Sequence, residues 1–227
     1  ARRKPIHQNV FYKRAPDPMA KTVILGSART PVGKLGGGLS SLKAVELGGI
    51  AIEAALERSG VSGDQIQHVI MGNVLQAGVG QIPSRQAQIA GGIPKEVSSE
   101  TVNKVCASGM RAVGLLDSAI RAGDIEVGLG GGMESMSNAP YMLPQARFGY
   151  RMGDGKMIDA MIHDGLTNPF SGKHMAHEAS EVAAEIEMTR ADMDRWSVRS
   201  HELTAKANDE GKLPEEIVSV TIKGRKG

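Results

Sequence analysis

Residues 98–122 read SSETVNKVCASGMRAVGLLDSAIRA and join a strand pattern to a helix pattern. Residues 98–103 are typical of a short strand, and residues 107–122 carry apolar side chains at helical spacing. The apolar residues on one face of this predicted helix are Met110, Val113, Leu116, Ala119 and Ile120. Cys106 falls between the two patterns. The stretch therefore predicts a strand, a tight turn and a helix, with a cysteine close to the helix start.

The same alternation of strand and helix patterns surrounds this stretch. Short apolar runs predict strands at residues 21–28, 67–71 and 126–129, and helical spacing predicts helices at 42–58 and 83–90. Strands that alternate with helices are typical of a layered α/β fold in which the sheet is mostly parallel. We therefore expect an α/β protein with helices packed on a mostly parallel sheet.

The character of the sequence changes beyond this alternating part. Residues 133–189 are rich in methionine, glycine and proline and have no long strand pattern. Helical spacing returns at residues 176–187 and 190–208, and residues 215–223 (EEIVSVTIK) predict a final strand. This part is therefore expected to be a loop-rich region that carries helices.

These patterns divide the chain into three segments. Residues 1–18 are basic, contain three prolines and lack the apolar segment of a secretory signal, so we expect an N-terminal extension or cloning scar that is disordered. Residues 19–139 form the predicted N-terminal α/β unit, and residues 140–227 form the loop-rich region. The boundary is placed near Pro140.

The composition limits the classes of function. The chain has 227 residues, of which 41% are hydrophobic and 23% charged, which is ordinary for a soluble globular protein. A net charge of +2 and an aromatic content of 3% give no support for nucleic-acid binding, and no apolar run is long enough to span a membrane. Because Cys106 is the single cysteine, no disulfide can form within the chain, which favours a cytoplasmic protein.

The position of Cys106 bears on its chemistry. Unpaired N–H groups and the positive end of the dipole lie at a helix start, and both favour a thiolate, which is the nucleophilic form. The residues that follow, Ala107, Ser108 and Gly109, are small and leave room for a substrate. The position alone also allows the opposite interpretation, in which Cys106 is an inert, buried hydrophobic residue.

Two histidines raise the question of a metal site. His174 and His177 are three residues apart and would share one face of a helix. A zinc site needs further ligands, which the sequence does not offer beside them. We therefore expect no metal ion.

Four stretches of this chain resemble motifs of the thiolase family, and they occur in the family's order. Residues 102–113 (VNKVCASGMRAV) resemble its acyl-enzyme signature, and residues 131–137 (GGMESMS) resemble a second conserved segment. Residues 28–34 (ARTPVGK) and 78–86 (GVGQIPSRQ) resemble two more. The resemblance implies a layered thiolase-like α/β fold, seen as the N-terminal half with part of the loop domain.

The thiolase resemblance also implies roles for particular residues. The cysteine matching Cys106 attacks a thioester and becomes acylated, while Leu166, His174 and Met175 match residues that line the pocket for the pantetheine and acyl groups. The His174-Met175 pair is more similar to acetoacetyl-CoA-forming members than to long-chain ones. The implied ligands are acetyl-CoA, acetoacetyl-CoA and CoA, with no separate cofactor. The family also implies fatty acid metabolism and a homo-oligomer, a dimer or a tetramer, assembled through the loop region.

Two catalytic motifs of the family do not occur in these 227 residues. One is a Gly-His-Pro segment, and the other is a Cys-x-Gly-x-Gly segment whose cysteine acts as the base in condensation. Because condensation requires removal of an α-carbon proton, we expect the C-terminal half to be absent and this chain to be incomplete for that reaction. Two alternatives stay open: a 3-ketoacyl-CoA thiolase for longer chains, and a non-catalytic fragment that acts only in assembly.

Overall fold

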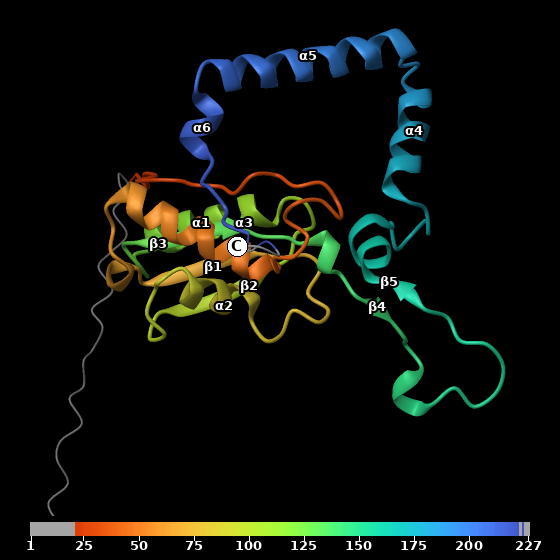
Figure 1. Cartoon of the computed structure of the whole chain (residues 1–227), viewed down its shortest axis with the longest axis horizontal. Helices are drawn as coiled ribbons and strands as arrows, with labels where there is room; N and C mark the ends of the chain where they lie inside the picture. Colours follow the sequence, from red (N-terminus) through yellow and green to blue (C-terminus); the bar gives the residue numbers. More distant parts are fainter. Residues whose placement is uncertain (1–20, 223, 225–227) are drawn as a thin grey trace, which may run out of the picture.

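The computed structural model describes residues 21–222 and residue 224 (Figure 1). The layered part contains α1 (Ala44–Ser59), η1 (Gly63–Gln65), β1 (His68–Gly72), α2 (Pro83–Ala90), β2 (Ser98–Val102), α3 (Ser108–Arg121) and β3 (Gly128–Gly132). The remaining elements are η2 (Met136–Asn138), β4 (Tyr141–Met142), η3 (Ala146–Phe148), β5 (Ile158–Asp159), the π-helix η4 (Met161–Leu166), α4 (Met175–Glu185), α5 (Arg190–Asp209) and α6 (Lys212–Glu216).

The core of the layered part is a parallel sheet with the strand order β2-β1-β3. The central strand, β1, pairs along its whole length: Gly72 lies opposite Val102 of β2 and Gly132 of β3. The three strands therefore end at the same level. The mostly parallel α/β sheet predicted from the sequence is confirmed. The predicted strands at 67–71 and 98–103 match β1 and β2, and the one predicted at 126–129 overlaps the start of β3.

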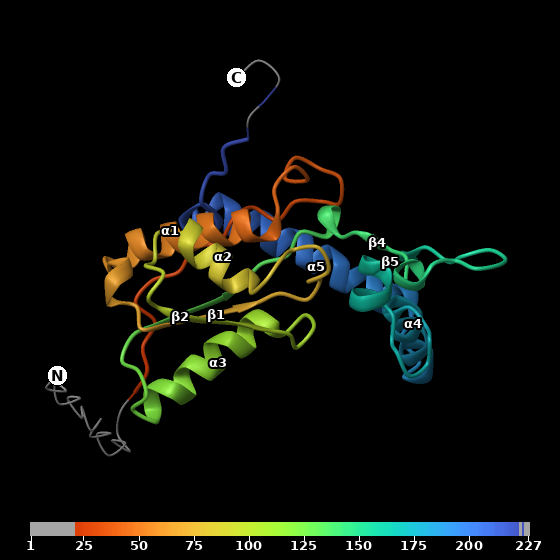
Figure 2. The ribbon, with the colours of Figure 1, turned by 90° about the horizontal axis from the view of Figure 1, so that it is seen from below.

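Helices cover both faces of the sheet. Figure 2 shows α1 and α2 on one face and α3 on the other. Successive side chains of a strand point to opposite faces, so Val69 and Met71 pack in the cluster with α1, whereas Ile70 packs against Ala112 and Leu116 of α3. Because β1 is buried on both faces, it reads as the continuous apolar run VIM.

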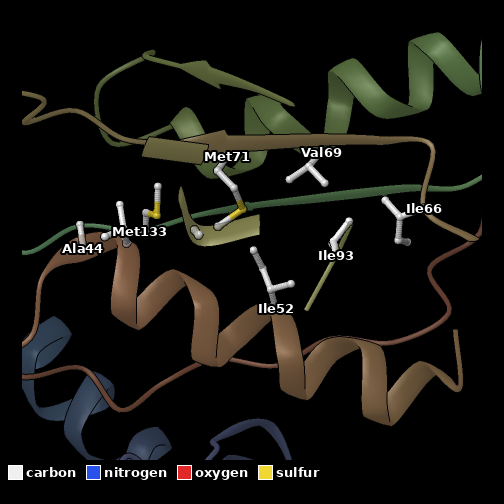
Figure 3. Packing of buried hydrophobic residues seen from close by; sticks show 9 residues of the cluster. Ala44, Ile52, Ile66, Val69, Met71, Ile93 and Met133 are labelled. Carbon is white, nitrogen blue, oxygen red and sulfur yellow. The ribbon is translucent and has the colours of Figure 1, made fainter. Parts of the chain in front are cut away.

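The main cluster lies between α1 and the sheet. Figure 3 shows Ile52 of α1 pointing toward Met71 and Ile93, and all three side chains are buried. Close approach of α1 and α2 depends on Gly49, where an added Cβ atom would lie 2.7 Å from the Ala90 Cβ. The glycine allows the two helices to share one apolar cluster with the sheet.

Glycines also bring α3 onto the ends of the strands. A Cβ atom added to Gly72 would lie 2.6 Å from the carbonyl carbon of Ser108, the first residue of α3. A Cβ atom added to Gly132 would lie 3.1 Å from the Gly109 Cα atom. The first turn of α3 therefore rests directly on the carboxyl ends of β1 and β3.

Two predicted strands do not form. Residues 21–28 have no regular secondary structure, and the side chains of Val23, Ile24 and Leu25 are exposed. The predicted strand at 215–223 overlaps α6, and its residue 223 lies outside the described residues.

Instead, Arg29, the residue after the first of these segments, pairs with the second at an isolated bridge. The Arg29 N–H donates to Glu216 O at 3.0 Å, and the Val218 N–H donates to Arg29 O at 2.8 Å. A strand needs a neighbour that satisfies its N–H and C=O groups along its length, and one residue pair does not supply this. The strand tendency of both apolar runs is therefore not realised.

Beyond η2 the chain leaves the layered part. β4 and β5 form a two-stranded antiparallel sheet, and α4, α5 and α6 then follow an arc that returns toward α1 (Figure 1). The helices predicted at 176–187 and 190–208 match α4 and α5. Many large apolar side chains of this arc are exposed, including Val182, Ile186, Met193, Trp196, Val198 and Leu203. The predicted extension at residues 1–18 lies outside the described residues.

No helix within the described part of the chain has both the length and the apolar composition that a membrane crossing requires.

The contact between Gly72 and α3 can be tested by substitution. Gly72→Ala is expected to lower the free energy of unfolding by about 1–3 kcal/mol, because the new methyl group has backbone atoms within van der Waals distance and must displace α3. Urea denaturation measures this change. Gly114→Ala in the middle of α3 is the matched control, because its Cβ meets open space, and it is expected to be neutral or to stabilise by up to ~1 kcal/mol. Equal effects of the two substitutions would contradict the packing described.

Candidate active site

Cys106 lies in the short connection between the end of β2 and the start of α3. Its side chain is exposed and free, so the interpretation of Cys106 as a buried hydrophobic residue does not hold in this structure. Val105 just before it has a φ of +50°, a left-handed conformation that is costly for a β-branched residue. Such strain persists only where the surroundings hold the backbone, and it is frequent at functional sites. The connection is thus a sharp strand-turn-helix elbow that presents the cysteine.

Two polar side chains hold this elbow in place. The hydroxyl of Ser108 accepts a hydrogen bond from the Lys104 N–H at 2.8 Å and donates to Val105 O at 2.6 Å. The side chain of Asn103 accepts from the Val105 N–H at 2.9 Å. Ser108 is buried, so its bonds are protected from water. Together these contacts fix the backbone on both sides of Val105.

A cavity of about 440 Å³ opens beside Cys106. This volume lies in the usual range for small-molecule pockets. The walls come from the ends of β1 and β3, from the elbow and α3, and from η4. The lining residues are Gly72, Val74, Leu75, Val105, Cys106, Ser108, Gly109, Gly132, Met133, Glu134, Met136, Gly165 and Leu166. The walls are mainly apolar, and Glu134 is the one acidic or basic side chain among these lining residues.

The structure brings Cys106 and Leu166 together although they are far apart in the sequence. Leu166 is the last residue of the π-helix η4 and lines the same cavity as Cys106. The preceding residue, Gly165, packs against Leu75: a Cβ added to Gly165 would lie 3.3 Å from the Leu75 Cδ2 atom. The loop-rich region therefore contributes one wall of a cavity that the layered part otherwise builds.

His174 and Met175 lie at the start of α4 and are not among the described residues that line this cavity. His174 is the N-cap of the helix, and its Nδ1 atom accepts a hydrogen bond from the Ala176 N–H at 3.1 Å. An antiparallel bridge joins His174 to Thr167, the residue after Leu166. The pair is thus connected to the end of η4, while Met175 is 43% exposed.

Charged groups near the start of α4 interact with one another. Lys173 donates a hydrogen bond to Glu181 at 2.5 Å, and His177 lies 3.4 Å from the same carboxylate oxygen. The hydrogen bond from Lys173 holds the pKa of Glu181 below its ordinary value; desolvation opposes this effect, and the positive charges of Lys173 and His177 add to it. His177 therefore faces a carboxylate on its own helix.

Groups of His, Cys, Asp or Glu that could hold a metal ion do not occur among the described residues.

The sequence prediction missed two residues beside the cavity. The carboxylate of Glu134 accepts hydrogen bonds from the Val74 and Leu75 N–H groups, and the buried side chain of Asn73 donates to the Met133 carbonyl. Glu134 belongs to the GGMESMS stretch, so a carboxylate within an otherwise small and apolar motif was the available signal.

Comparison with known proteins identifies related sequences. Residues 22–227 match the family model described as the N-terminal domain of thiolase. An acetyl-CoA acetyltransferase of Cupriavidus necator is 50% identical over 209 residues, which cover 92% of this chain and 53% of that protein. An acetyl-CoA acetyltransferase of Syntrophomonas wolfei is 46% identical, with 91% of this chain and 53% of that protein covered. The mitochondrial acetyl-CoA acetyltransferase of Xenopus tropicalis is 44% identical, with 90% and 49% covered.

The chain spans about half the length of the curated relatives it matches.

The role of Ser108 in the elbow gives a prediction. Ser108→Ala leaves the Lys104 N–H without its acceptor in a partly buried place, so the free energy of unfolding is expected to fall by about 1–3 kcal/mol. Amide hydrogen exchange at Lys104 is expected to accelerate. Ser118→Ala is the matched control, because the exposed hydroxyl of Ser118 only donates to the Gly114 carbonyl within α3, and its effect is expected to stay within about 0.5 kcal/mol. Unchanged exchange at Lys104 in the Ser108 variant would refute this account of the elbow.

Proposed function

Because this chain belongs to the thiolase family, we propose that Cys106 accepts an acyl group from an acyl-CoA thioester. The observation that carries the proposal is the placement of Cys106: an exposed thiol on a strained elbow, at the start of α3, beside a largely apolar cavity. A nucleophile, room for an acyl group and a helix start thus meet at one place.

The proposed step is a thioester exchange. The Cys106 sulfur attacks the carbonyl carbon of the acyl-CoA, and a new carbon–sulfur bond forms. The bond to the CoA sulfur then breaks, and CoA leaves as a thiol with the proton that the Cys106 thiol gave up. The acyl group stays activated, because one thioester replaces another, and covalent catalysis of this kind divides a difficult reaction into two easier steps.

The negative charge that develops on the carbonyl oxygen needs hydrogen-bond donors. The backbone N–H groups in the first turn of a helix have no acceptor within the helix and lie at the positive end of its dipole. Cys106 lies two residues before α3, and the Ser108 N–H already donates to Val105 O at 3.1 Å. We therefore assign the stabilisation of this oxygen to the N–H groups of the first turn beyond Ser108. Fixed donors of this kind stabilise the transition state of acyl transfer.

The cavity supplies a place for the acyl group. Val74, Leu75 and Leu166 form apolar walls close to Cys106. We assign Leu166 to contact with the acyl group, and we assign His174 and Met175 to the pantetheine, because the 167–174 bridge connects them to the end of η4. CoA belongs to the substrate in this proposal, and no separate cofactor or metal ion is invoked.

The finer proposal is that this chain is the N-terminal part of an acetyl-CoA acetyltransferase. Proteins with that name share 44% to 50% identity with it, and the proposed substrates and products are acetyl-CoA, acetoacetyl-CoA and CoA. Condensation also needs a base that removes a proton from the second acetyl group. Both oxygens of Glu134, the carboxylate of the cavity, already accept N–H groups. We therefore assign the acylation half-reaction to these 227 residues and not the complete condensation.

A thiolase reaction on longer acyl chains is the second candidate. The observation behind it is the cavity of about 440 Å³ with mainly apolar walls, which has room for an acyl chain longer than acetyl. Rates of Cys106 acylation by acyl-CoA substrates of increasing chain length distinguish the two. A maximum at acetyl-CoA supports the first candidate, and a maximum at longer chains supports the second.

The proposal includes a homo-oligomer in the cytoplasm with a role in fatty acid metabolism. The homo-oligomer is supported by the exposed apolar face of α5, with Met193, Trp196 and Leu203, because large exposed apolar patches mark association surfaces. The free thiol of Cys106 suits a reducing compartment. Size exclusion with light scattering is expected to give a dimer or tetramer, and a monomer at all concentrations would contradict this part. A stable oligomer whose Cys106 is never acylated would instead indicate a fragment that acts only in assembly.

The acylation step can be measured on the chain itself. After brief incubation with acetyl-CoA, the intact mass is expected to increase by one acetyl group, because the exposed Cys106 thiol is the nucleophile. Cys106→Ala removes the nucleophile and is expected to abolish the increase, without a large change in the unfolding free energy. An equal mass increase in wild type and variant would rule out Cys106 as the acyl carrier, and no increase in the folded wild type would reject the half-reaction.

A further inference from the structure

The chain turns sharply after β1, and a carboxylate from the end of β3 holds this turn. The Val74 N–H donates to one oxygen of Glu134 at 2.9 Å, and the Leu75 N–H donates to the other at 3.2 Å. Glu134 is half-buried. Hydrogen bonds to an ionised acceptor are stronger than those between neutral groups, so the turn is fixed firmly at two successive residues.

A third donor reaches the same carboxylate. The side-chain amide of Asn73 donates to Glu134 at 2.9 Å and to the Met133 carbonyl at 3.2 Å. Asn73 is 1% exposed. Its own N–H donates to Val102 O at 3.1 Å, so this residue connects the ends of β2, β1 and β3. The turn is therefore anchored to the sheet as well as to Glu134.

The anchored turn forms a wall of the Cys106 cavity. The side chains of Val74 and Leu75 line it, and Leu75 packs against Gly165. Leu166, the residue after Gly165, lines the same cavity from η4. A chain of contacts thus runs from the Glu134 carboxylate through Leu75 to the wall that Leu166 provides.

The turn is also joined to the cysteine elbow. The side-chain amide of Asn103 reaches Val74 O at 3.5 Å, and its side-chain oxygen accepts from the Val105 N–H at 2.9 Å. The elbow and the 73–75 turn therefore share one side chain. A shift of the turn would move the wall of the cavity relative to Cys106.

We propose that Glu134 is a positioning residue for acyl transfer: its carboxylate fixes the 73–75 turn and thereby sets the distance between the Leu75–Leu166 wall and Cys106. The inference rests on the proposed acylation of Cys106. A carboxylate is required because three N–H donors converge on its two oxygens. An amide would turn an N–H group toward another N–H group and leave at least one donor unpaired.

Glu134→Gln tests this role, since it keeps the size of the side chain and changes only the acceptors. The rate constant of Cys106 acylation at saturating acetyl-CoA is expected to fall ~10-fold or more, because small displacements of reacting groups are costly. Alkylation of Cys106 by iodoacetamide does not depend on the Leu75–Leu166 wall. Because the thiol is exposed, its alkylation rate is expected to change by less than about twofold. Amide exchange at Val74 and Leu75 is expected to accelerate.

Glu46→Gln is the matched control. The Glu46 carboxylate accepts the Lys43 N–H at 2.7 Å at the start of α1 and does not line the cavity. Its substitution removes a comparable charge and is expected to leave acylation unchanged.

The other possible outcomes distinguish the positioning role of Glu134 from the proposed acylation of Cys106. Wild-type acylation rates in Glu134→Gln overturn the positioning role while the function of Cys106 stands. Equal losses of acylation and alkylation, with a lower unfolding midpoint, show a structural role alone and also overturn it. A wild-type chain that is alkylated but never acetylated refutes the proposed function, and the positioning role falls with it.

Discussion

The first turn of α3 rests on the carboxyl ends of β1 and β3, and the geometry of the site depends on this contact. It requires Gly72 and Gly132, because a side chain at either position would meet the backbone of Ser108 or Gly109. The helix start is therefore brought to the edge where the parallel strands end. Open α/β sheets bind their ligands at this edge. Cys106 reaches it because the elbow before α3 is fixed by Ser108.

Much of this arrangement could be predicted from the sequence, because it depends on local periodicity. The run around β1 is apolar on both faces and marks a central strand, while the spacing from Met110 to Ile120 marks α3. Local periodicity could not show whether the strands expected at 21–28 and 215–223 would form. Whether an apolar run becomes a strand depends on a neighbour along its whole length, and among the described residues an isolated bridge joins Arg29, just after the first run, to Ile217 of the second.

Some details of the site could likewise be predicted from local sequence patterns, and others could not. The elbow at Cys106 was predicted because its signal is local, but the role of Glu134 was not, because its partners at Val74 and Leu75 lie about sixty residues earlier. The meeting of Leu166 with Cys106 in one cavity came from family resemblance and not from spacing. The layered part and the loop-rich region therefore build the cavity jointly. Acyl transfer at Cys106 would depend on contacts that cross between them.

The central claim is that Cys106 carries the acyl group, and peptide mapping after reaction with acetyl-CoA tests it most directly. Trypsin cleaves after Lys104 and after Arg111, so the cysteine is recovered in the peptide 105–111. One acetyl group is expected on this peptide, and neutral hydroxylamine is expected to remove it, because hydroxylamine cleaves thioesters and leaves amides intact. Acetyl groups found only on lysines such as Lys104, and stable to hydroxylamine, would contradict the account.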